Sequence, residues 1–403
     1  MERVKKLVFA VSNDLSYDQR MQRICTTLAE AGYDVTLVGR ERNSSIALVE
    51  QPYRQLRLNL FFEKGKSFYI ALNVRLFFYL LFQKFDAVCG IDLDTAVPCL
   101  LVAKLKGKTF VYDAHELFTE VPEVIKRPGV RAVWQKAESF VVRRAKFFYT
   151  VSESVAEEFN RRYGNKPEVI RNLPLRNHAN QSVDQNALVE AQQRQQNNSN
   201  LTQGGTKLQL VETSLPPESN SASVKTIVYR GAVNAGRGVE QAIEAMQRLP
   251  NLRLLVAGDG DVLDDAKALV QKLNLGDQIT FTGYASPSRL NELTTNAWLG
   301  LNLLDGTSMN YRFSLANKFF DFIQCGVPQI TMRFPEYERV NNRYRIAMLI
   351  DDLRVDALVA AVNALVENEA LYRELKLNCI EAAADLCWEN ERGTLLEFYR
   401  SLP

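Results

Sequence analysis

The sequence has few of the residues that most often bind metal ions. Only two histidines, His115 and His178, occur in 403 residues, and no two of the six cysteines have the two-residue spacing of common zinc sites. Such scattered cysteines predict reduced, mostly buried thiols in a cytosolic protein. They are Cys25, Cys89, Cys99, Cys325, Cys379 and Cys387.

An excess of charge of one sign is lacking as well. Lys and Arg total 49 against 47 for Asp and Glu, so the formal net charge is only +2. No broad positive field is available to bind a nucleic-acid backbone, and no nucleic-acid partner is expected. The length exceeds what one compact core usually fills and predicts two domains.

The sequence also has no uninterrupted apolar run of membrane-spanning length. The run Leu7–Val11 is too short for a signal-peptide core and predicts a first strand. The aromatic stretch Phe68–Phe85 is interrupted by Asn73, Arg75, Gln83 and Lys84 before the roughly 20 apolar residues that a span requires. We favour an interior helix there; the alternative is a surface helix that dips into a membrane. We expect a cytoplasmic protein, with peripheral contact to the inner face of the membrane as the open alternative.

Strand-like apolar runs alternate with helical patterns through residues 1–175. A helix is expected at Gln19–Ala31, and the following Gly32 suits a helix C-terminus. This rhythm predicts an α/β domain with a doubly wound parallel sheet. The expected strands are Leu7–Val11, Val35–Val38, Ala87–Ile91, Phe110–Tyr112 and Phe147–Val151.

Residues 176–224 interrupt this alternation. They are rich in Gln, Asn and Ser and have no apolar period, which predicts a linker or an inserted surface loop. A second doubly wound domain is expected over residues 225–385, and a last helix, at about 386–403, is expected to cross back to the first domain. The strands of this second domain are expected at Thr226–Tyr229, Leu252–Ala257, Ile279–Phe281, Leu299–Leu303 and Gln329–Thr331. Ligands of such sheets collect at the carboxyl ends of the strands, so the two domains should face each other across a cleft.

A glycine-rich turn, Tyr229 to Gly238, follows the first strand of the second domain and precedes a helical pattern. Gly231, Gly236 and Gly238 allow positive φ and close approach of a ligand. The helix start offers free N–H groups, and Arg237 adds a permanent positive charge. The turn is a candidate diphosphate site, with an ordinary strand-to-helix turn as the alternative.

A second cluster, Asn317 to Asp321, comes about 80 residues later. We predict that Lys318, at the start of a helix, binds the same diphosphate as Arg237, because a hydrogen bond to a charged group contributes roughly 1.5 to 3 kcal/mol. Asp321 lies one turn beyond Lys318, where its carboxylate can accept both hydroxyls of a ribose. One alternative is that Arg237 and Lys318 are solvated surface cations. Another is that Lys318 forms an ion pair with Asp321. Nucleobase selection is expected near Gly283 and Tyr284.

Polar residues at strand ends of the first domain predict an acceptor pocket. His115 follows a strand, and flanking carboxylates can fix its tautomer and tune its basicity. The alternatives are a structural histidine and, for Asp94 with Thr95, a helix N-cap. The acceptor-site candidates beside His115 are Asp18, Arg20, Asp92, Asp94, Asp113 and Glu116.

Together these motifs resemble those of family 4 glycosyltransferases of the GT-B fold, in which two Rossmann-like domains enclose the active site. The resemblance covers most of the chain apart from the Gln/Asn-rich stretch. It rests on Asp18 and Arg20, Asp92-Leu93-Asp94-Thr95, Tyr112-Asp113-Ala114-His115-Glu116, Thr150-Val151-Ser152, Gly231 with Arg237-Gly238, Gly258-Asp259-Gly260, and Asn317-Lys318-Phe319-Phe320-Asp321 before Cys325-Gly326-Val327-Pro328.

The resemblance implies transfer of a sugar from a nucleotide diphosphate donor to an acceptor hydroxyl, with retention and without a required metal or other cofactor. By that resemblance Arg237 and Lys318 stabilise the leaving diphosphate, Asp321 holds the ribose and His115 contacts the transferred sugar. A UDP- or GDP-sugar and a glycan or lipid-linked acceptor of bacterial surface polysaccharide synthesis are expected.

Two positions depart from the family pattern. Asp321 stands where the family usually has glutamate, and Phe313 replaces a second glutamate eight positions earlier. Ala316 also occupies a position where related members tend to have proline. Two alternatives therefore stay open: a noncatalytic nucleotide-sugar-binding protein of the same fold, and a nucleotide-sugar epimerase.

Overall fold

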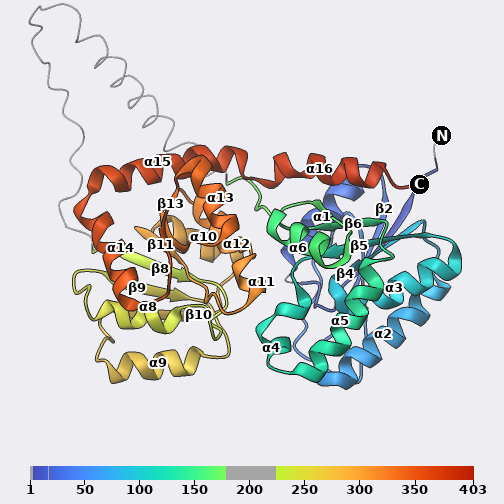
Figure 1. The fold of residues 1–403 in the computed structure, drawn as a ribbon, viewed down its shortest axis with the longest axis horizontal. Coiled ribbons are helices and arrows are strands. Elements are labelled where there is room, and N and C mark those ends of the chain that lie inside the picture. The colour runs from blue at the N-terminus through green and yellow to red at the C-terminus, as the bar shows by residue number, and fades with distance from the viewer. Residues whose placement is uncertain (1–2, 17, 178–223) are drawn as a thin grey trace, which may run out of the picture.

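The computed structural model describes residues 3–16, 18–177 and 224–403. Two lobes lie side by side, each built on a wholly parallel sheet (Figure 1). The first sheet has the order β3-β2-β1-β4-β5-β6-β7, and the second has the order β10-β9-β8-β11-β12-β13. In each sheet the chain winds outward from the middle in both directions. The carboxyl ends of the central strands, β1 with β4 and β8 with β11, therefore form a switch point where ligands can bind.

The strands are short and mostly buried. In the first lobe they are β1 (Lys6–Ala10), β2 (Asp34–Arg40), β3 (Arg54–Leu58), β4 (Ala87–Ile91), β5 (Thr109–Ala114), β6 (Phe147–Thr150) and β7 (Glu168–Val169). In the second lobe they are β8 (Thr226–Arg230), β9 (Arg253–Ala257), β10 (Ile279–Gly283), β11 (Leu299–Asn302), β12 (Gln329–Met332) and β13 (Ala347–Ile350).

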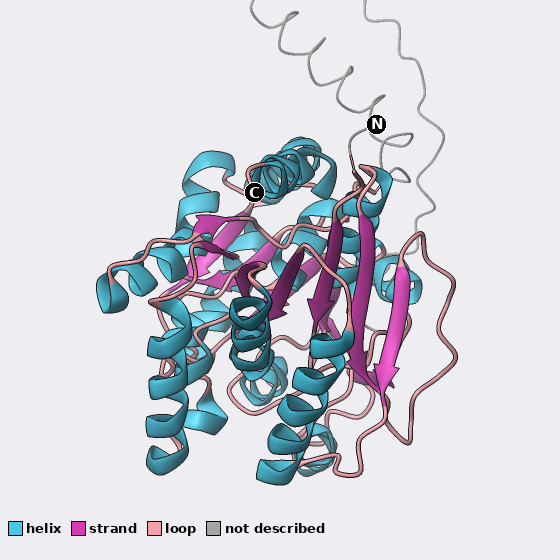
Figure 2. Cartoon of the chain, turned by 90° about the vertical axis from the view of Figure 1, so that its right-hand side faces the viewer, coloured by secondary structure: helices cyan, strands magenta, loops and turns pink. Residues whose placement is uncertain are grey.

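Helices cover both faces of each sheet (Figure 2). In the first lobe they are α1 (Gln19–Glu30), α2 (Gly65–Phe82), α3 (Asp92–Lys106), the 3-10 helix η1 (Phe118–Glu120), α4 (Pro122–Ile125), α5 (Pro128–Val142) and α6 (Glu153–Tyr163). From residue 224 onward they are α8 (Val239–Met246), α9 (Leu263–Lys272), α10 (Pro287–Thr295), α11 (Met309–Arg312), α12 (Asn317–Gln324), α13 (Pro335–Tyr344), α14 (Val355–Glu367), α15 (Glu369–Asp385) and α16 (Trp388–Arg400).

The predicted fold class, two doubly wound parallel sheets facing across a cleft, is confirmed. All ten strands expected from the sequence form, and the described residues contain three further strands, β3, β7 and β13, that were not predicted. These three lie at sheet edges. β3 is partly exposed and carries polar side chains, and β7 has only two residues, so their sequence signals are weak. β13 is an apolar run that the sequence analysis overlooked.

The C-terminal helix α16 crosses back onto the first lobe, as predicted (Figure 1). Its Trp388 Nε1 donates to Thr27 Oγ1 of α1 at 2.9 Å. The hydroxyl of Tyr399 lies 3.3 Å from that of Tyr149 at the end of β6, and both rings are buried. The domain boundaries themselves stay predictions, and most of the predicted linker at 176–224 lies outside the described residues.

The helix α2 differs from the interior helix that we favoured. One side buries Phe68, Leu72, Leu76 and Leu80, but large apolar side chains of the opposite side are exposed. The stretch is apolar all round, so its sequence contains no sign of which side faces the sheet. The interior prediction is therefore right for only one face of the helix.

Two findings concern possible membrane-spanning helices and the state of the cysteines. No helix in the described ranges combines the length and apolar character needed to cross a bilayer. The six cysteines are all free and buried, in agreement with the prediction of reduced thiols.

Candidate active site

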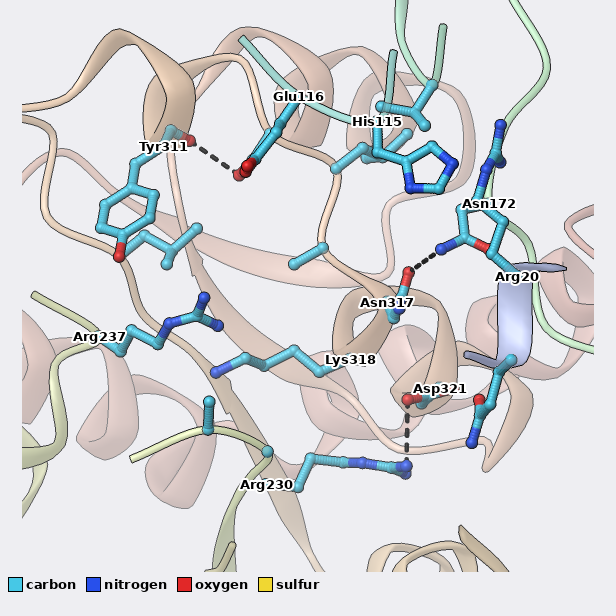
Figure 3. A pocket seen from close by; sticks show the side chains of 18 of the residues that line it. Arg20, His115, Glu116, Asn172, Arg230, Arg237, Tyr311, Asn317, Lys318 and Asp321 are labelled. Atoms are coloured by element: carbon cyan, nitrogen blue, oxygen red, sulfur yellow. Dashed lines mark hydrogen bonds and ion pairs between the residues drawn. The ribbon is translucent and has the colours of Figure 1, made fainter. Parts of the chain in front are cut away.

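A cleft of about 590 Å³ opens between the two lobes, and side chains of both line it (Figure 3). It lies at the carboxyl ends of the central strands, where the sheet topology predicts a ligand site. The first lobe contributes Asn13, Asp18, Gln19, Arg20, His115, Glu116, Val151, Val155 and Asn172. The second contributes Arg230, Gly231, Ala232, Arg237, Pro287, Leu290, Leu304, Asn310, Tyr311, Ser314, Leu315, Ala316, Asn317, Lys318 and Asp321.

The glycine-rich turn after β8 has the backbone that the sequence predicts. Gly231 adopts φ 100°, and its N–H donates to Ala257 O at the end of β9. A Cβ at Gly258 would lie 1.8 Å from Gly231 O, so a side chain there would force the two strand ends apart. The close approach of these two backbones opens the turn toward the cleft.

Arg237 and Lys318 point toward one another in this cleft (Figure 3). Lys318 Nζ is buried without a hydrogen-bond partner and lies 4.5 Å from the centre of the Tyr229 ring. Burial, together with the charges of Arg237 and Arg230, lowers the pKa of Lys318 to about 7. Arg237 Nε is likewise unpartnered, and neither cation forms an ion pair with another described residue. Both predicted cations thus line the same cleft between the lobes, and their binding of a diphosphate stays a prediction.

Asp321 forms an ion pair with Arg230 rather than with Lys318. The distance from Arg230 Nη2 to Asp321 Oδ2 is 3.0 Å. The alternative of an ion pair between Lys318 and Asp321 is therefore wrong. Asn317, at the start of α12, accepts a hydrogen bond of 2.7 Å from Asn172 Nδ2 across the cleft. Asn317 and Asp321, the two residues of α12 predicted to contact the nucleoside, thus both face the cleft.

His115 is held between two carboxylates of the first lobe. Its Nε2 lies 3.0 Å from Asp113 Oδ2, and its Nδ1 lies 3.6 Å from Asp92 Oδ2. Burial lowers the pKa of His115, but the charges of Asp113 and Asp92 outweigh it and raise the pKa to about 9. Asp113 favours the protonated, hydrogen-bond-donating imidazole, because the charges of Arg20 and His115 outweigh its burial and lower its own pKa. Burial raises the pKa of Asp92 to about 8, so its contribution at neutral pH is weaker.

Asp113 does not line the cleft, although it was predicted to contact the acceptor. The strand β5 continues through Ala114, two residues further than predicted, which keeps Asp113 inside the sheet and fully buried. There it accepts from Arg20 Nη2 at 3.2 Å. Arg20 does line the cleft, but its side chain is only 3% exposed because it pairs with Asp113 and also donates to Ile170 O.

Of the other four predicted acceptor residues, two line the cleft and two do not. Asp92 and Asp94 are absent from the lining, because α3 begins at Asp92 and turns both toward the protein. Asp94 is not an N-cap, and burial raises its pKa to about 6. Asp18 lines the cleft and also caps α1 through Met21 N. Glu116 lines it too, and accepts from Asn310 Nδ2 of the second lobe at 3.0 Å.

Four predicted donor-site residues lie outside the lining. Gly236 and Gly238, both at positive φ, shape the turn and pack against Asp305 and Leu303 instead. Gly283 ends β10 and Tyr284 follows it; β10 is an edge strand two places from the switch point. Their predicted role in nucleobase selection stays a prediction. In the described residues no group of three or more His, Cys, Asp or Glu is arranged to hold a metal ion.

Several cleft residues escaped the sequence analysis. Arg230 was the most detectable, since it is a charged residue at the end of an apolar strand directly before Gly231. Asn310 and Tyr311 belong to a polar loop that carries no distinctive spacing. Asn172 follows the short strand β7 and gave no signal at all.

The sequence matches two family models. Glycosyltransferase Family 4 covers residues 19–173, and Glycosyl transferases group 1 covers residues 212–385. The chain belongs to the family 4 glycosyltransferases of the GT-B fold. The resemblance stated from its motifs is thereby confirmed, and the protein is a glycosyltransferase. No curated relative matches the sequence at a significant level.

Solved glycosyltransferase structures share the fold along nearly the whole chain. Sucrose-phosphate synthase from Thermosynechococcus elongatus is 18% identical with a TM-score of 0.75, covering 99% of this chain and 98% of that one. Anabaena Alr3699/HepE in complex with UDP-glucose is 12% identical with a TM-score of 0.73, covering 99% and 100%. WaaG, a glycosyltransferase involved in lipopolysaccharide biosynthesis, is 14% identical with a TM-score of 0.65, covering 97% and 99%.

Proposed function

We propose that this glycosyltransferase moves a sugar from a UDP- or GDP-sugar to an acceptor hydroxyl, with retention at the anomeric carbon and without a metal ion. The observation that carries the proposal is the pair of cations, Arg237 and Lys318, that meet in the cleft without a counter-ion among the described residues. A diphosphate supplies the missing negative charge. The complexes of Anabaena HepE with UDP and with UDP-glucose, on the same fold, support a nucleotide-sugar donor.

In this proposal Arg237 and Lys318 act on the leaving group. When the bond between the anomeric carbon and the phosphate oxygen breaks, the electron pair stays on the phosphate. Fixed positive charges at that oxygen stabilise the transition state more than the ground state, which accelerates the reaction. This is the work that a divalent cation would otherwise do.

His115 is proposed to position the transferred sugar. Its Nε2 is engaged by Asp113, whereas its Nδ1 lies 3.6 Å from Asp92 Oδ2, beyond hydrogen-bonding distance, and is available to a sugar hydroxyl. Because Asp113 favours the protonated ring, His115 is proposed to donate a hydrogen bond rather than to act as a base. Arg20 supports it indirectly by fixing Asp113.

The acceptor is proposed to be a glycan or lipid-linked glycan of bacterial surface polysaccharide synthesis, at the inner face of the membrane. The support is the α2 outer stripe, which consists of Ile70, Val74, Phe78 and Phe82 and is 52% to 79% exposed. Exposed apolar groups in such a row are typical of a contact surface. Exposed Lys64, Lys66 and Arg75 on and beside the helix favour an anionic bilayer.

Co-sedimentation with lipid vesicles tests the membrane contact. We expect binding to vesicles that contain anionic lipid, and loss of binding in the double variant Val74→Glu, Phe78→Glu. The matched control is Val366→Glu on α14, an exposed valine of the other lobe, which should bind as the wild type does. Equal binding by the stripe variant would refute the contact.

Release of nucleoside diphosphate from UDP- and GDP-sugars, with membrane extract as acceptor source, tests the transferase activity. No release with any donor would contradict the proposal. Binding without release would favour the noncatalytic alternative, which Phe313 motivates: this residue packs against the apolar core of the first lobe and does not line the cleft. Conversion of the donor sugar without release would favour the epimerase.

A further inference from the structure

A short segment of the second lobe, residues 308–313, docks on the first lobe, and we call it the α11 bridge. Its apolar side chains, Met309 and Phe313, pack against the apolar core of the first lobe. Ser308 Oγ donates to Glu120 O of the first lobe at 2.6 Å. Apolar packing and a hydrogen bond therefore fasten this part of the second lobe to the opposite one.

Asn310 lies in the middle of the α11 bridge and is only 7% exposed. Its Oδ1 accepts from Leu117 N at 3.0 Å, and its Nδ2 donates to Glu116 Oε2 at 3.0 Å. Because a backbone N–H can only donate, the amide oxygen must face Leu117, and the amide nitrogen then faces the carboxylate. One side chain thus bonds to two consecutive residues of the other lobe, and both directly follow His115.

His115 itself is held by the first lobe. Its backbone N–H donates to Asp92 Oδ1 at 2.8 Å, and its Nε2 lies 3.0 Å from Asp113 Oδ2. The turn formed by residues 115–117 is therefore held from two directions. The first lobe sets the orientation of the ring, whereas the bonds to Asn310 set how far the turn lies from the second lobe.

The α11 bridge also reaches the cationic part of the cleft. Tyr311 follows Asn310, and the guanidinium carbon of Arg237 lies 5.8 Å from the centre of the Tyr311 ring. Figure 3 shows Tyr311 beside Arg237, and Glu116 between Tyr311 and His115. The bridge therefore connects a side chain proposed to bind the diphosphate with the turn whose histidine is proposed to position the sugar.

We propose that Asn310 is a positioning residue for sugar transfer, because it fixes the His115 turn relative to the cations of the second lobe. This inference rests on the proposed function. Transfer requires the sugar and its leaving group to be held in one geometry, and small displacements of such groups slow a reaction strongly. One lobe holds the diphosphate and the other positions the sugar, so a bond between the lobes at this point determines that geometry.

The departure from the family pattern at Phe313 agrees with this role. Where the family usually has glutamate, this chain has a ring that packs against the first-lobe core and does not line the cleft. An ionised carboxylate would be costly in such apolar surroundings. Phenylalanine therefore suits an anchor for the α11 bridge.

Steady-state kinetics, and calorimetry with UDP and GDP, test the inference on Asn310→Leu. This variant keeps the approximate volume of the side chain but loses both bonds to the turn. We expect kcat to fall by about 10- to 100-fold. The dissociation constant of the nucleoside diphosphate should change by less than about twofold, because the cations that hold it stay in place.

Ser154→Ala is the matched control. It removes another hydrogen bond between the lobes, from Ser154 Oγ to Glu336 Oε1 at 2.7 Å, and neither residue lines the cleft. If the α11 bridge acts through the His115 turn and not through lobe contact in general, this variant should keep kcat within about twofold of the wild type.

A double variant separates positioning from a purely structural role. In a His115→Asn background, Asn310→Leu should lower kcat by less than about threefold, because the group that it positions is already gone. An equally large fall in that background would overturn the inference. So would an unchanged kcat in Asn310→Leu alone.

Hydrogen exchange followed by mass spectrometry reads the α11 bridge without any activity. The Leu117 N–H should exchange at least about tenfold faster in Asn310→Leu than in the wild type or in Ser154→Ala. Asn310→Asp guards against a folding defect: it keeps an acceptor for Leu117 N, so protection should remain and kcat should lie between those of the wild type and Asn310→Leu. Rapid exchange of Leu117 in the wild type would overturn the inference. Protection of Leu117 without any sugar transfer by the wild type would contradict the proposed function and, with it, the role of Asn310.

Discussion

The two lobes share one strand order, but they differ in whether the cations at the cleft discussed above have carboxylate partners. In the first lobe Arg20 pairs with Asp113, and His115 lies between Asp113 and Asp92. In the second lobe Lys318 and Arg237 have no counter-ion in the described part of the chain. Burial consequently lowers the pKa of Lys318, whereas the carboxylates raise that of His115.

This difference indicates a division of labour. Paired charges are stable without a ligand and serve to orient other groups. A buried cation without an ion-pair partner, as Lys318 is, is costly in the free protein, and an anionic ligand removes that cost. We therefore infer that the paired charges of the first lobe orient other groups, whereas the unpaired cations of the second lobe bind an anion. Four predictions test this contrast, from the largest expected effect to the smallest.

Loss of either unpaired cation should have the largest effect on activity. Arg237→Ala and Lys318→Met are each expected to cost about 1.5 to 3 kcal/mol of transition-state stabilisation, a fall of roughly 10- to 150-fold in kcat/KM. Steady-state kinetics measures this. Lys272→Met, at an exposed lysine at the end of α9, is the control and should leave kcat/KM unchanged. Full activity in either cleft variant would remove the assignment of the diphosphate to these side chains.

Loss of the positioned cation in the first lobe should affect turnover but not nucleotide binding. His115→Asn is expected to lower kcat by up to about 100-fold. The dissociation constant of the nucleoside diphosphate should change by less than about twofold, since His115 lies in the other lobe from the diphosphate site. Kinetics and calorimetry on the same variant separate the two effects. An unchanged kcat would assign His115 a purely structural role.

The affinity for a nucleoside diphosphate should fall as the pH rises above 7. Lys318 has a pKa of about 7 in the free protein, and a bound diphosphate favours the ammonium form and raises that pKa. Binding is then coupled to proton uptake, and the affinity should fall by up to about tenfold per pH unit from pH 7 toward the pKa of the complex. Calorimetry between pH 7 and 9 measures the slope. Lys318→Met should abolish it; the same slope in that variant would show that another group titrates.

The smallest effect concerns stability. Because the pKa of Lys318 is lowered, its ammonium form opposes folding, and the folded state is favoured as pH rises from about 7 toward the usual range of lysine. Lys318→Met should therefore stabilise the free protein by about 1 kcal/mol or more, raising Tm by roughly 2 to 4 °C at pH 7. Thermal unfolding followed by circular dichroism measures this. A lower Tm in Lys318→Met would mean that the buried ammonium group does not destabilise the folded protein.

The sequence predicts well those features that depend on local patterns. The turn from Tyr229 to Gly238 is recognisable because glycines and one arginine fall between a strand and a helix. Lys318 is recognisable because it begins a helix after a polar loop. In both cases neighbouring residues in the chain determine the backbone, and the side chain then points to the carboxyl ends of the strands.

Features that depend on packing between distant segments could not be predicted. The ion pair of Arg230 with Asp321 exists because α10 and α12 flank the end of β8, which no spacing reveals. Asp113 was assigned to the cleft because the carboxyl end of β5 was predicted two residues too early. The outer side of α2 was assigned to the interior because its sequence is apolar on every side.

The most direct test of the central claim is a crystal structure of the protein with UDP or GDP bound. Our account predicts that the diphosphate oxygens lie within hydrogen-bonding distance of both the Arg237 guanidinium and Lys318 Nζ, in the cleft between the lobes. A nucleotide whose phosphates contact neither side chain, or one bound outside this cleft, would contradict it.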